Sequence, residues 1–84
     1  MEQVKATISD DDGVLIERVT AWIQRINRQR WGGHFITLQD DIYELEQYLF
    51  KTTDGRSARI QINQIIGGSN RDTRVEFVGD GPLE

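Results

Sequence analysis

Arginine and tryptophan recur at helical spacing between residues 18 and 31, where they are the side chains best suited to bind a ligand. Arg18, Trp22 and Arg25 follow at intervals of four and three, and Arg28 and Trp31 lie close by. On one flank of a helix they can stack on a nucleobase and contact phosphates, or anchor a protein partner. Alternatively, Trp22 lies at the core margin and the arginines pack over it while reaching water. The strip therefore predicts a partner or nucleic-acid contact, with the structural interpretation left open.

A glycine-rich segment at residues 67–72 is the second candidate for ligand binding. Backbone amides and a guanidinium in such a segment could hold a phosphate. The spaced G-K-[ST] ending of a P-loop is missing, and the segment leads into a strand instead of a helix. A plain hairpin loop is the simpler interpretation, and a nucleotide or small anion held between the loops of a dimer is a third functional hypothesis. The residues of this possible anion loop are Gly67, Gly68, Ser69, Asn70 and Arg71.

Side chains that catalyse reactions do not occur in a usable pattern. His34 is the single histidine and the chain has no cysteine, so neither a thiol–imidazole pair nor a histidine-based metal cluster can form. No serine stands in the G-x-S-x-G setting of a nucleophile elbow. Among the paired carboxylates, Asp40 and Asp41 point in different directions on a helix, whereas Asp40 and Glu44 share its solvated face. The sequence predicts a protein that is not an enzyme and has no cofactor.

Three consecutive aspartates, at residues 10–12, superficially suggest a calcium loop. An EF-hand loop needs oxygen ligands at alternating positions, but Val14 occupies the third of these positions. Carboxylates at the start of a helix are instead expected to cap it and to interact with its dipole. No metal site is predicted.

The charge balance argues against a protein that coats nucleic acid non-specifically. The formal charge is −4 and the pI is near 4.9, whereas that binding mode depends on neutralising many phosphates. Eight of the ten basic residues are arginine, the side chain that makes planar, bidentate or stacked contacts. This bias favours specific contacts.

Cysteine content and hydropathy indicate a cytoplasmic protein. Without cysteine there is no disulfide framework, and nothing suggests an oxidising compartment. The N-terminus lacks a basic segment followed by an apolar run, and no apolar stretch approaches the roughly 20 residues that span a bilayer. We expect no membrane association.

Residues 37–50 give the clearest helix pattern, and we take this helix as the centre of the fold. Thr37 can cap its N-terminus with Asp40 three residues on, which completes a capping box. One face then carries apolar residues at spacings of four, three and four, and we expect it to pack on a sheet. These residues are Leu38, Ile42, Leu45 and Leu49.

A first helix is predicted from about residue 14 to Arg30 or Trp31, where Gly32 and Gly33 supply the C-cap. The apolar residues of this segment fit an arc about 120° wide at the helical period. The alternative is a hairpin turn at residues 9–13 followed by a strand, but that strand would bury Glu17 or Arg18. The arc consists of Leu15, Ile16, Val19, Trp22, Ile23 and Ile26.

Strands are predicted at residues 3–8, 34–36, 57–66 and 73–78, with a bulge near Asn63 and Gln64 and an antiparallel hairpin formed by the last two. The order strand, helix, strand, helix, strand, strand predicts an α+β fold, with two helices on one face of a mostly antiparallel sheet of three to four strands. Residues 1–79 would form this single domain and residues 80–84 a flexible tail. The open sheet face would carry Arg59, Gln61, Asn63, Arg74 and Glu76.

Tyr43, Glu46 and Phe50 widen the apolar arc of the central helix beyond what packing on one sheet requires. Glu46 either pairs with Arg59 or Arg74, or belongs with the two aromatic residues to a protein interface. The leading hypothesis is a non-enzymatic interaction protein, a regulator, inhibitor or accessory subunit, which forms a homodimer and binds a protein partner. Small acidic proteins of this kind are common among phage and mobile-element modulators. Nucleic-acid binding by the arginine–tryptophan strip is the alternative.

Overall fold

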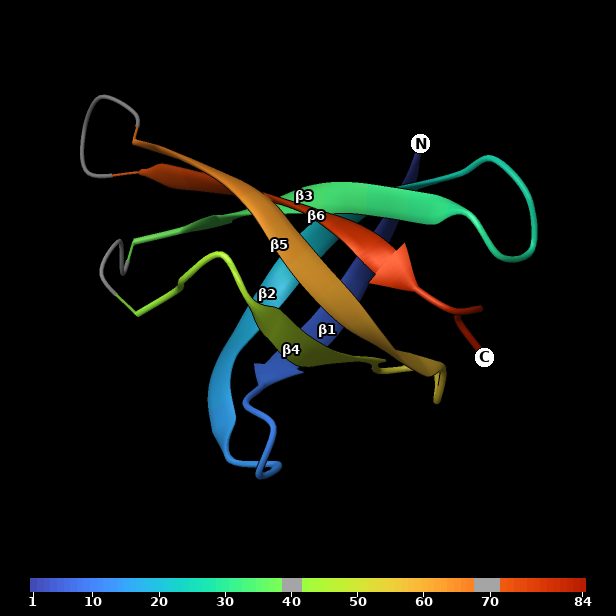
Figure 1. Cartoon of the computed structure of the whole chain (residues 1–84), viewed down its shortest axis with the longest axis horizontal. Helices are drawn as coiled ribbons and strands as arrows, with labels where there is room; N and C mark the ends of the chain where they lie inside the picture. Colours follow the sequence, from blue (N-terminus) through green and yellow to red (C-terminus); the bar gives the residue numbers. More distant parts are fainter. Residues whose placement is uncertain (39–41, 68–71) are drawn as a thin grey trace.

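The structure is a computed structural model that describes residues 1–38, 42–67 and 72–84. All regular secondary structure in these residues is β-strand, and buried and exposed residues alternate along the strands. The six strands form a closed barrel (Figure 1). They are β1 (Glu2–Ser9), β2 (Leu15–Arg25), β3 (Trp31–Thr37), β4 (Gln47–Thr52), β5 (Ser57–Gly67) and β6 (Thr73–Asp80).

The strands are arranged around the barrel in the order β1-β2-β3-β6-β5-β4, and β4 pairs with β1 to close it. Every neighbouring pair is antiparallel. Each described strand therefore has a hydrogen-bonded neighbour on both sides along at least part of its length, which shortens the free sheet edges that promote aggregation.

The connection from β3 to β4 joins strands that are not neighbours, because β6 and β5 lie between them on one side and β2 and β1 on the other.

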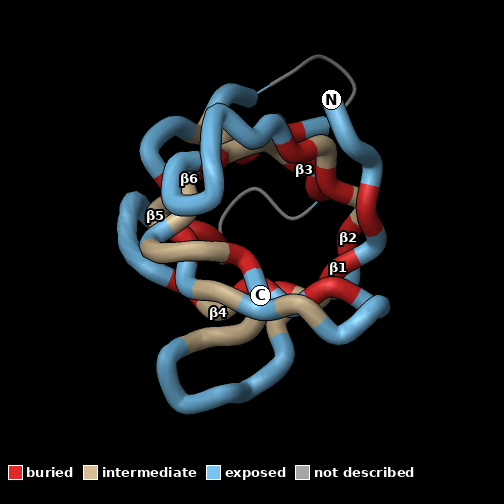
Figure 2. Tube along the Cα trace, turned by 90° about the vertical axis from the view of Figure 1, so that its right-hand side faces the viewer, coloured by how far each residue is buried: buried red, intermediate tan, exposed pale blue. Residues whose placement is uncertain are grey.

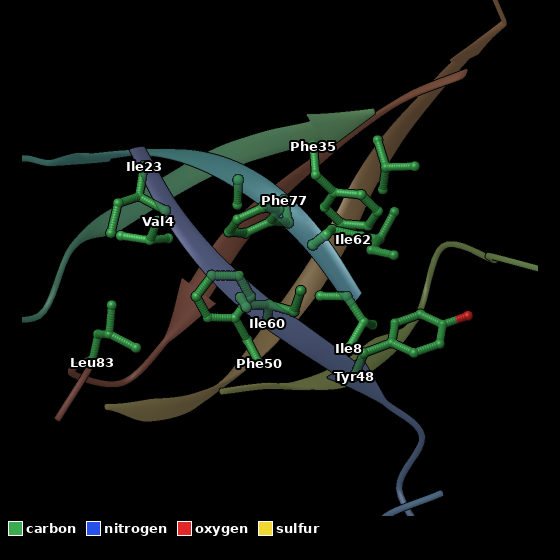
Figure 3. Packing of buried hydrophobic residues seen from close by; sticks show 14 of the residues in the cluster. Val4, Ile8, Ile23, Phe35, Tyr48, Phe50, Ile60, Ile62, Phe77 and Leu83 are labelled. Carbon is green, nitrogen blue, oxygen red and sulfur yellow. The ribbon is translucent and has the colours of Figure 1, made fainter. Parts of the chain in front are cut away.

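The barrel interior is filled by side chains that alternate along every strand. Figure 2 shows the buried residues distributed along the strands around the ring. In Figure 3, Phe50, Ile60 and Phe77 lie near one another inside the barrel. The ring centroids of Phe50 and Phe77 are 5.4 Å apart, and those of Trp31 and Phe50 are 5.7 Å apart. The largest fully buried side chains are Phe35, Phe50, Ile8, Ile23, Ile60, Ile62, Val75 and Thr37.

The predicted first helix is wrong, because the segment forms strand β2. Val19, Ala21 and Ile23 point into the core with a period of two, and the intervening residues face outward. The sequence argument against a strand is that it would bury Glu17 or Arg18, and Arg18 is in fact exposed. The structure does turn Glu17 inward, but its carboxylate accepts hydrogen bonds from the hydroxyls of Thr37 (2.9 Å) and Tyr43 (2.8 Å). A partly buried carboxylate with two donors can be accommodated.

The predicted central helix at residues 37–50 is also wrong. Thr37 ends β3, residues 42–46 are irregular, and β4 begins at Gln47. The burial pattern differs from the helical expectation, since Leu38 and Leu45 of the predicted core face are exposed whereas Tyr43 and Phe50 are buried. Pairing of β4 with both β1 and β5 outweighs a local preference of a few tenths of a kcal/mol per residue. The described residues contain no helix, so the α+β class is replaced by an all-β barrel.

The predicted strands are confirmed, with longer bounds, as β1, β3, β5 and β6. The bulge is confirmed as a register shift between Ile62 and Gln64, and β5 and β6 pair antiparallel. The bulge changes the side-chain parity of β5, so Ile65 pairs with inward-facing Val75 while Ile66 faces outward.

Gly32 and Gly33 are not a helix C-cap but lie within β3. A Cβ at Gly33 would stand 2.1 Å from the backbone oxygen of Trp22, and one at Gly32 would stand 2.8 Å from the backbone oxygen of Phe77. Glycine therefore permits the close approach of β3 to both neighbouring strands.

The C-terminal residues follow β6 across one end of the barrel. Leu83 is buried, and the backbones of Ser57 and Glu84 exchange hydrogen bonds. The indole of Trp31 donates to the carbonyl oxygen of Gly81 over 2.8 Å. The part of the chain that the structure describes has no helix of the length and apolarity that crossing a membrane requires.

Candidate ligand-binding surface

Three rows of outward-facing side chains run across β2, β3, β6 and β5. In the middle row Trp22 pairs with His34, His34 with Glu76, and Glu76 with Gln64. Neighbouring strands lie about 4.8 Å apart, so these side chains form a continuous surface.

The rows on either side add apolar residues to this surface. In one, Arg74 of β6 lies between Ile36 of β3 and Ile66 of β5. In the other, Val78 of β6 lies between Gly32 and Gln61. We call the surface formed by Trp22, His34, Ile36, Ile66, Arg74, Glu76 and Val78 the outer-face patch.

Two aromatic rings stack at the centre of the patch. The ring centroids of Trp22 and His34 are 5.3 Å apart and the planes differ by 11°. Desolvation and the neighbouring Arg74 guanidinium lower the pKa of His34, against a smaller opposing effect of Glu76. His34 is therefore neutral at pH 7, and its Nδ1 lies 3.5 Å from Nη2 of Arg74.

Arg74 also forms an ion pair with Glu76, with 3.0 Å between Nε and Oε2. Both side chains remain partly exposed to solvent, and an ion pair of this kind contributes at most about 1 kcal/mol. A ligand carboxylate or phosphate can therefore compete for Arg74 at little cost.

A groove with a volume of about 580 Å³ lies over β3 and β6, and its floor includes Gly32, Gly33 and Val78. The β2–β3 hairpin contributes Ile26, Gln29 and Arg30 to the lining, and Asn63 and residues of the patch line the groove as well.

Hydrogen bonds within the β2–β3 hairpin fix its backbone beside the groove. The side-chain oxygen of Asn27 accepts from the backbone amides of Gln29 (2.9 Å) and Arg30 (3.0 Å), and the amide of Ile26 donates to the carbonyl of Arg30 (2.8 Å). The backbone at Arg30 is thus fixed while its side chain stays exposed.

The arginines divide into a paired and an unpaired group. Those at positions 28, 56, 59 and 74 form ion pairs. Arg18, Arg25 and Arg30 form no ion pair with any residue that the structure describes. All three belong to β2 and the hairpin that follows it, and Arg30 is the one of the three that lines the groove.

The predicted arginine–tryptophan strip is divided by the strand geometry. Arg18 and Trp22 share the outer face of β2, with Thr20 between them. Trp31 is instead buried in the core, and Arg28 pairs with Glu84 over 2.7 Å. Arg25 lies at the end of β2 opposite Trp31.

The predicted protein-interface residues Tyr43, Glu46 and Phe50 do not form an outward patch. Phe50 is in the core, and Tyr43 packs against Phe35 with ring centroids 5.2 Å apart. Burial and the hydrogen bond to Glu17 raise the pKa of Tyr43 well above its usual value. Glu46 is exposed and accepts a hydrogen bond from the Tyr48 hydroxyl over 3.3 Å, whereas Arg59 and Arg74 pair with other carboxylates.

The possible anion loop cannot be placed, because residues 68–71 lie outside the described residues and only Gly67, the last residue of β5, is seen. Within the described residues, no group of three or more histidine, cysteine, aspartate or glutamate side chains could hold a metal ion.

Sequence reasoning placed Arg74 and Glu76 on the open face of a sheet but missed the Trp22–His34 pair and the exposed Ile36, Ile66 and Val78. The alternation of Arg74, Glu76 and Val78 with buried neighbours was the available signal. Trp22 could not be identified as the cross-strand partner of His34, because β2 was expected to be helical.

Comparisons with protein-family models, curated proteins and solved structures find no match for this chain.

Proposed function

We propose that the protein is a non-enzymatic binding module, a regulator, inhibitor or accessory subunit, that recognises a protein partner through the outer-face patch. The observation that carries this proposal is the grouping of exposed apolar side chains with Trp22 and Arg74 in adjoining rows. Ile36, Ile66 and Val78 are 42%, 40% and 44% exposed. Tryptophan and arginine are enriched among residues that dominate protein interfaces, and apolar neighbours exclude water from them.

The closed barrel favours recognition by side chains. Many domains bind a peptide by adding it as a strand to a free sheet edge. None of the six described strands has an edge that is free along its whole length, because each pairs with two neighbours. A partner would therefore contact the outer surface, where the patch combines apolar, aromatic and charged groups.

Nucleic acid is the second candidate, favoured by the unpaired Arg18 beside Trp22. The net charge of −4 opposes it, and His34 already stacks on the indole. We place the protein in the cytoplasm, which fits a chain without cysteine. A second copy of the chain is a further candidate partner.

The test is affinity capture from cells of the source organism, with quantitative mass spectrometry of the captured proteins. We expect Ile36→Asp and Val78→Asp to lose a partner that the wild type captures, because a charge placed within the patch is left unpaired on binding. Leu45→Asp is the matched control, since Leu45 is an exposed leucine in the β3–β4 connection. Thermal melts establish that each variant is folded. If both patch variants capture the same proteins as wild type, the proposal is wrong.

A further inference from the structure

We infer that the groove binds a short, extended, acidic segment of the partner. This inference rests on the proposed function and specifies the chemistry of what the outer-face patch recognises.

The size of the patch favours a short segment over a folded domain. Its outer rows are separated by the four residues from Gly32 to Ile36, roughly 13 Å along β3, and its strands span three spacings, roughly 14 Å. The projected area is on the order of 200 Å², well below the roughly 800 Å² that each partner buries in a standard interface. The groove shares His34, Arg74, Glu76 and Val78 with the patch, whose length of roughly 13 Å accommodates about four extended residues.

The charges of the groove favour an acidic occupant. Arg30 and Arg74 line it, and Glu76 is the single carboxylate among the described residues that do so. Arg30 has no ionic partner in the part of the chain that is described, and the Arg74–Glu76 pair is solvent-accessible. Acidic side chains of an extended segment can therefore pair with the unpaired guanidinium of Arg30 and with the solvent-accessible guanidinium of Arg74.

The remaining lining suits a peptide backbone in particular. Side-chain amides from Gln24, Gln29 and Asn63 offer both donors and acceptors. The backbone of an extended segment needs both, because each residue presents one amide and one carbonyl. Ile26 and Val78 offer apolar contacts to its alternate side chains. A nucleic-acid strand would instead require more cations and an unoccupied aromatic face.

The test begins with selection of random dodecapeptides displayed on phage against the immobilised full chain. Enriched peptides are synthesised with a fluorescein label and titrated by fluorescence polarisation. We expect enrichment of peptides with at least two acidic residues, and binding that weakens as the salt concentration rises from about 0.05 to about 0.5 M. Arg30→Gln and Arg74→Gln should each weaken binding about tenfold, since each removes a charge-assisted hydrogen bond.

Arg18→Gln is the matched control, because Arg18 is also exposed and without an ion pair among described residues but lies outside the groove. We expect a change of less than about twofold, since the loss of a distant exposed charge is screened. Circular dichroism of each variant verifies the fold.

Several results would overturn the inference. One is a selection that enriches no peptide, and another is a selection that enriches peptides that lack acidic residues. The third such result is a peptide affinity that neither Arg30→Gln nor Arg74→Gln changes. Tighter binding of a fluorescein-labelled 20-mer of deoxythymidine than of any selected peptide would assign the groove to nucleic acid. Concentration-dependent dimerisation lost in Arg30→Gln would assign it to a second copy. If the peptides fail while Ile36→Asp still loses its captured partner, the protein-binding function stands and only the acidic segment is wrong.

Discussion

Replacing Phe50 with alanine should remove a large fraction of the stability of the barrel. The side chain is 0% exposed and packs against Trp31 and Phe77. Truncation of a buried phenylalanine costs about 3–5 kcal/mol through lost burial and the cavity that remains. A domain of this length has a total unfolding free energy of roughly 4–13 kcal/mol. Phe50→Ala is therefore expected to be marginally folded at room temperature.

Leu45→Ala is the matched substitution, because the barrel and the helical interpretation of residues 37–50 predict opposite results. On the helix, Leu45 would face the core and Phe50 a partner. In the barrel, Leu45 is 65% exposed. We expect its truncation to change the unfolding free energy by no more than about 0.5 kcal/mol.

Urea denaturation followed by tryptophan fluorescence measures both effects. The buried indole of Trp31 lies near Phe50 and reports on core packing. Phe50→Leu keeps most of the volume and should cost less than Phe50→Ala, which provides a measurable value if the alanine variant does not fold. A Leu45→Ala loss equal to or larger than that of Phe50→Ala, at an unchanged denaturant slope, would refute the barrel packing.

Two further predictions concern polar contacts. Tyr43→Phe should cost about 1–2 kcal/mol in urea denaturation, because it removes the hydrogen bond to Glu17; no loss would show that this hydrogen bond does not stabilise the fold. Hydrogen bonds from Arg56 and Thr52 lower the pKa of Asp54 from 3.8 to about 2, so its stabilising effect is complete above about pH 4 and is lost as the pH falls through 2. NMR titration of the Asp54 carboxyl carbon should show this pKa, and Arg56→Gln should raise it toward the usual value; an unchanged pKa in the variant would contradict the assigned cause.

Strands that alternate cleanly were predictable from the sequence, and those with a competing helical period were not. In β6, Val75 and Phe77 alternate with Arg74 and Glu76, and no helical arc competes. In β2, Val19 and Ile23 fit both a strand and a helix, because a separation of four is compatible with either period. The local sequence pattern is compatible with both helix and strand in this segment. Pairing with β1 and β3 stabilises the strand.

The outer-face patch could likewise be recognised only with residues 15–25 assigned to a strand. Trp22 and His34 are twelve positions apart in sequence, and they meet only because β2 and β3 form a hairpin in the register that pairs them. Ile66 and Arg74 meet only because the bulge in β5 shifts its parity. Sequence spacing reports which residues share one element, whereas this surface is assembled from four.

The inward-facing Glu17 is the main reason why residues 15–25 are predicted to be helical instead of forming β2. An inward-facing carboxylate normally argues against a strand, because burial without hydrogen-bond donors is costly. Its donors, Thr37 and Tyr43, come from segments 20 and 26 residues away. Tyr43 lies in the β3–β4 connection, so the contact that makes Glu17 acceptable also ties that connection to β2. The polar contacts of Tyr43 are thereby directed inward, so Tyr43 does not belong to the exposed surface of β3 and β6 that we propose as the partner-binding site.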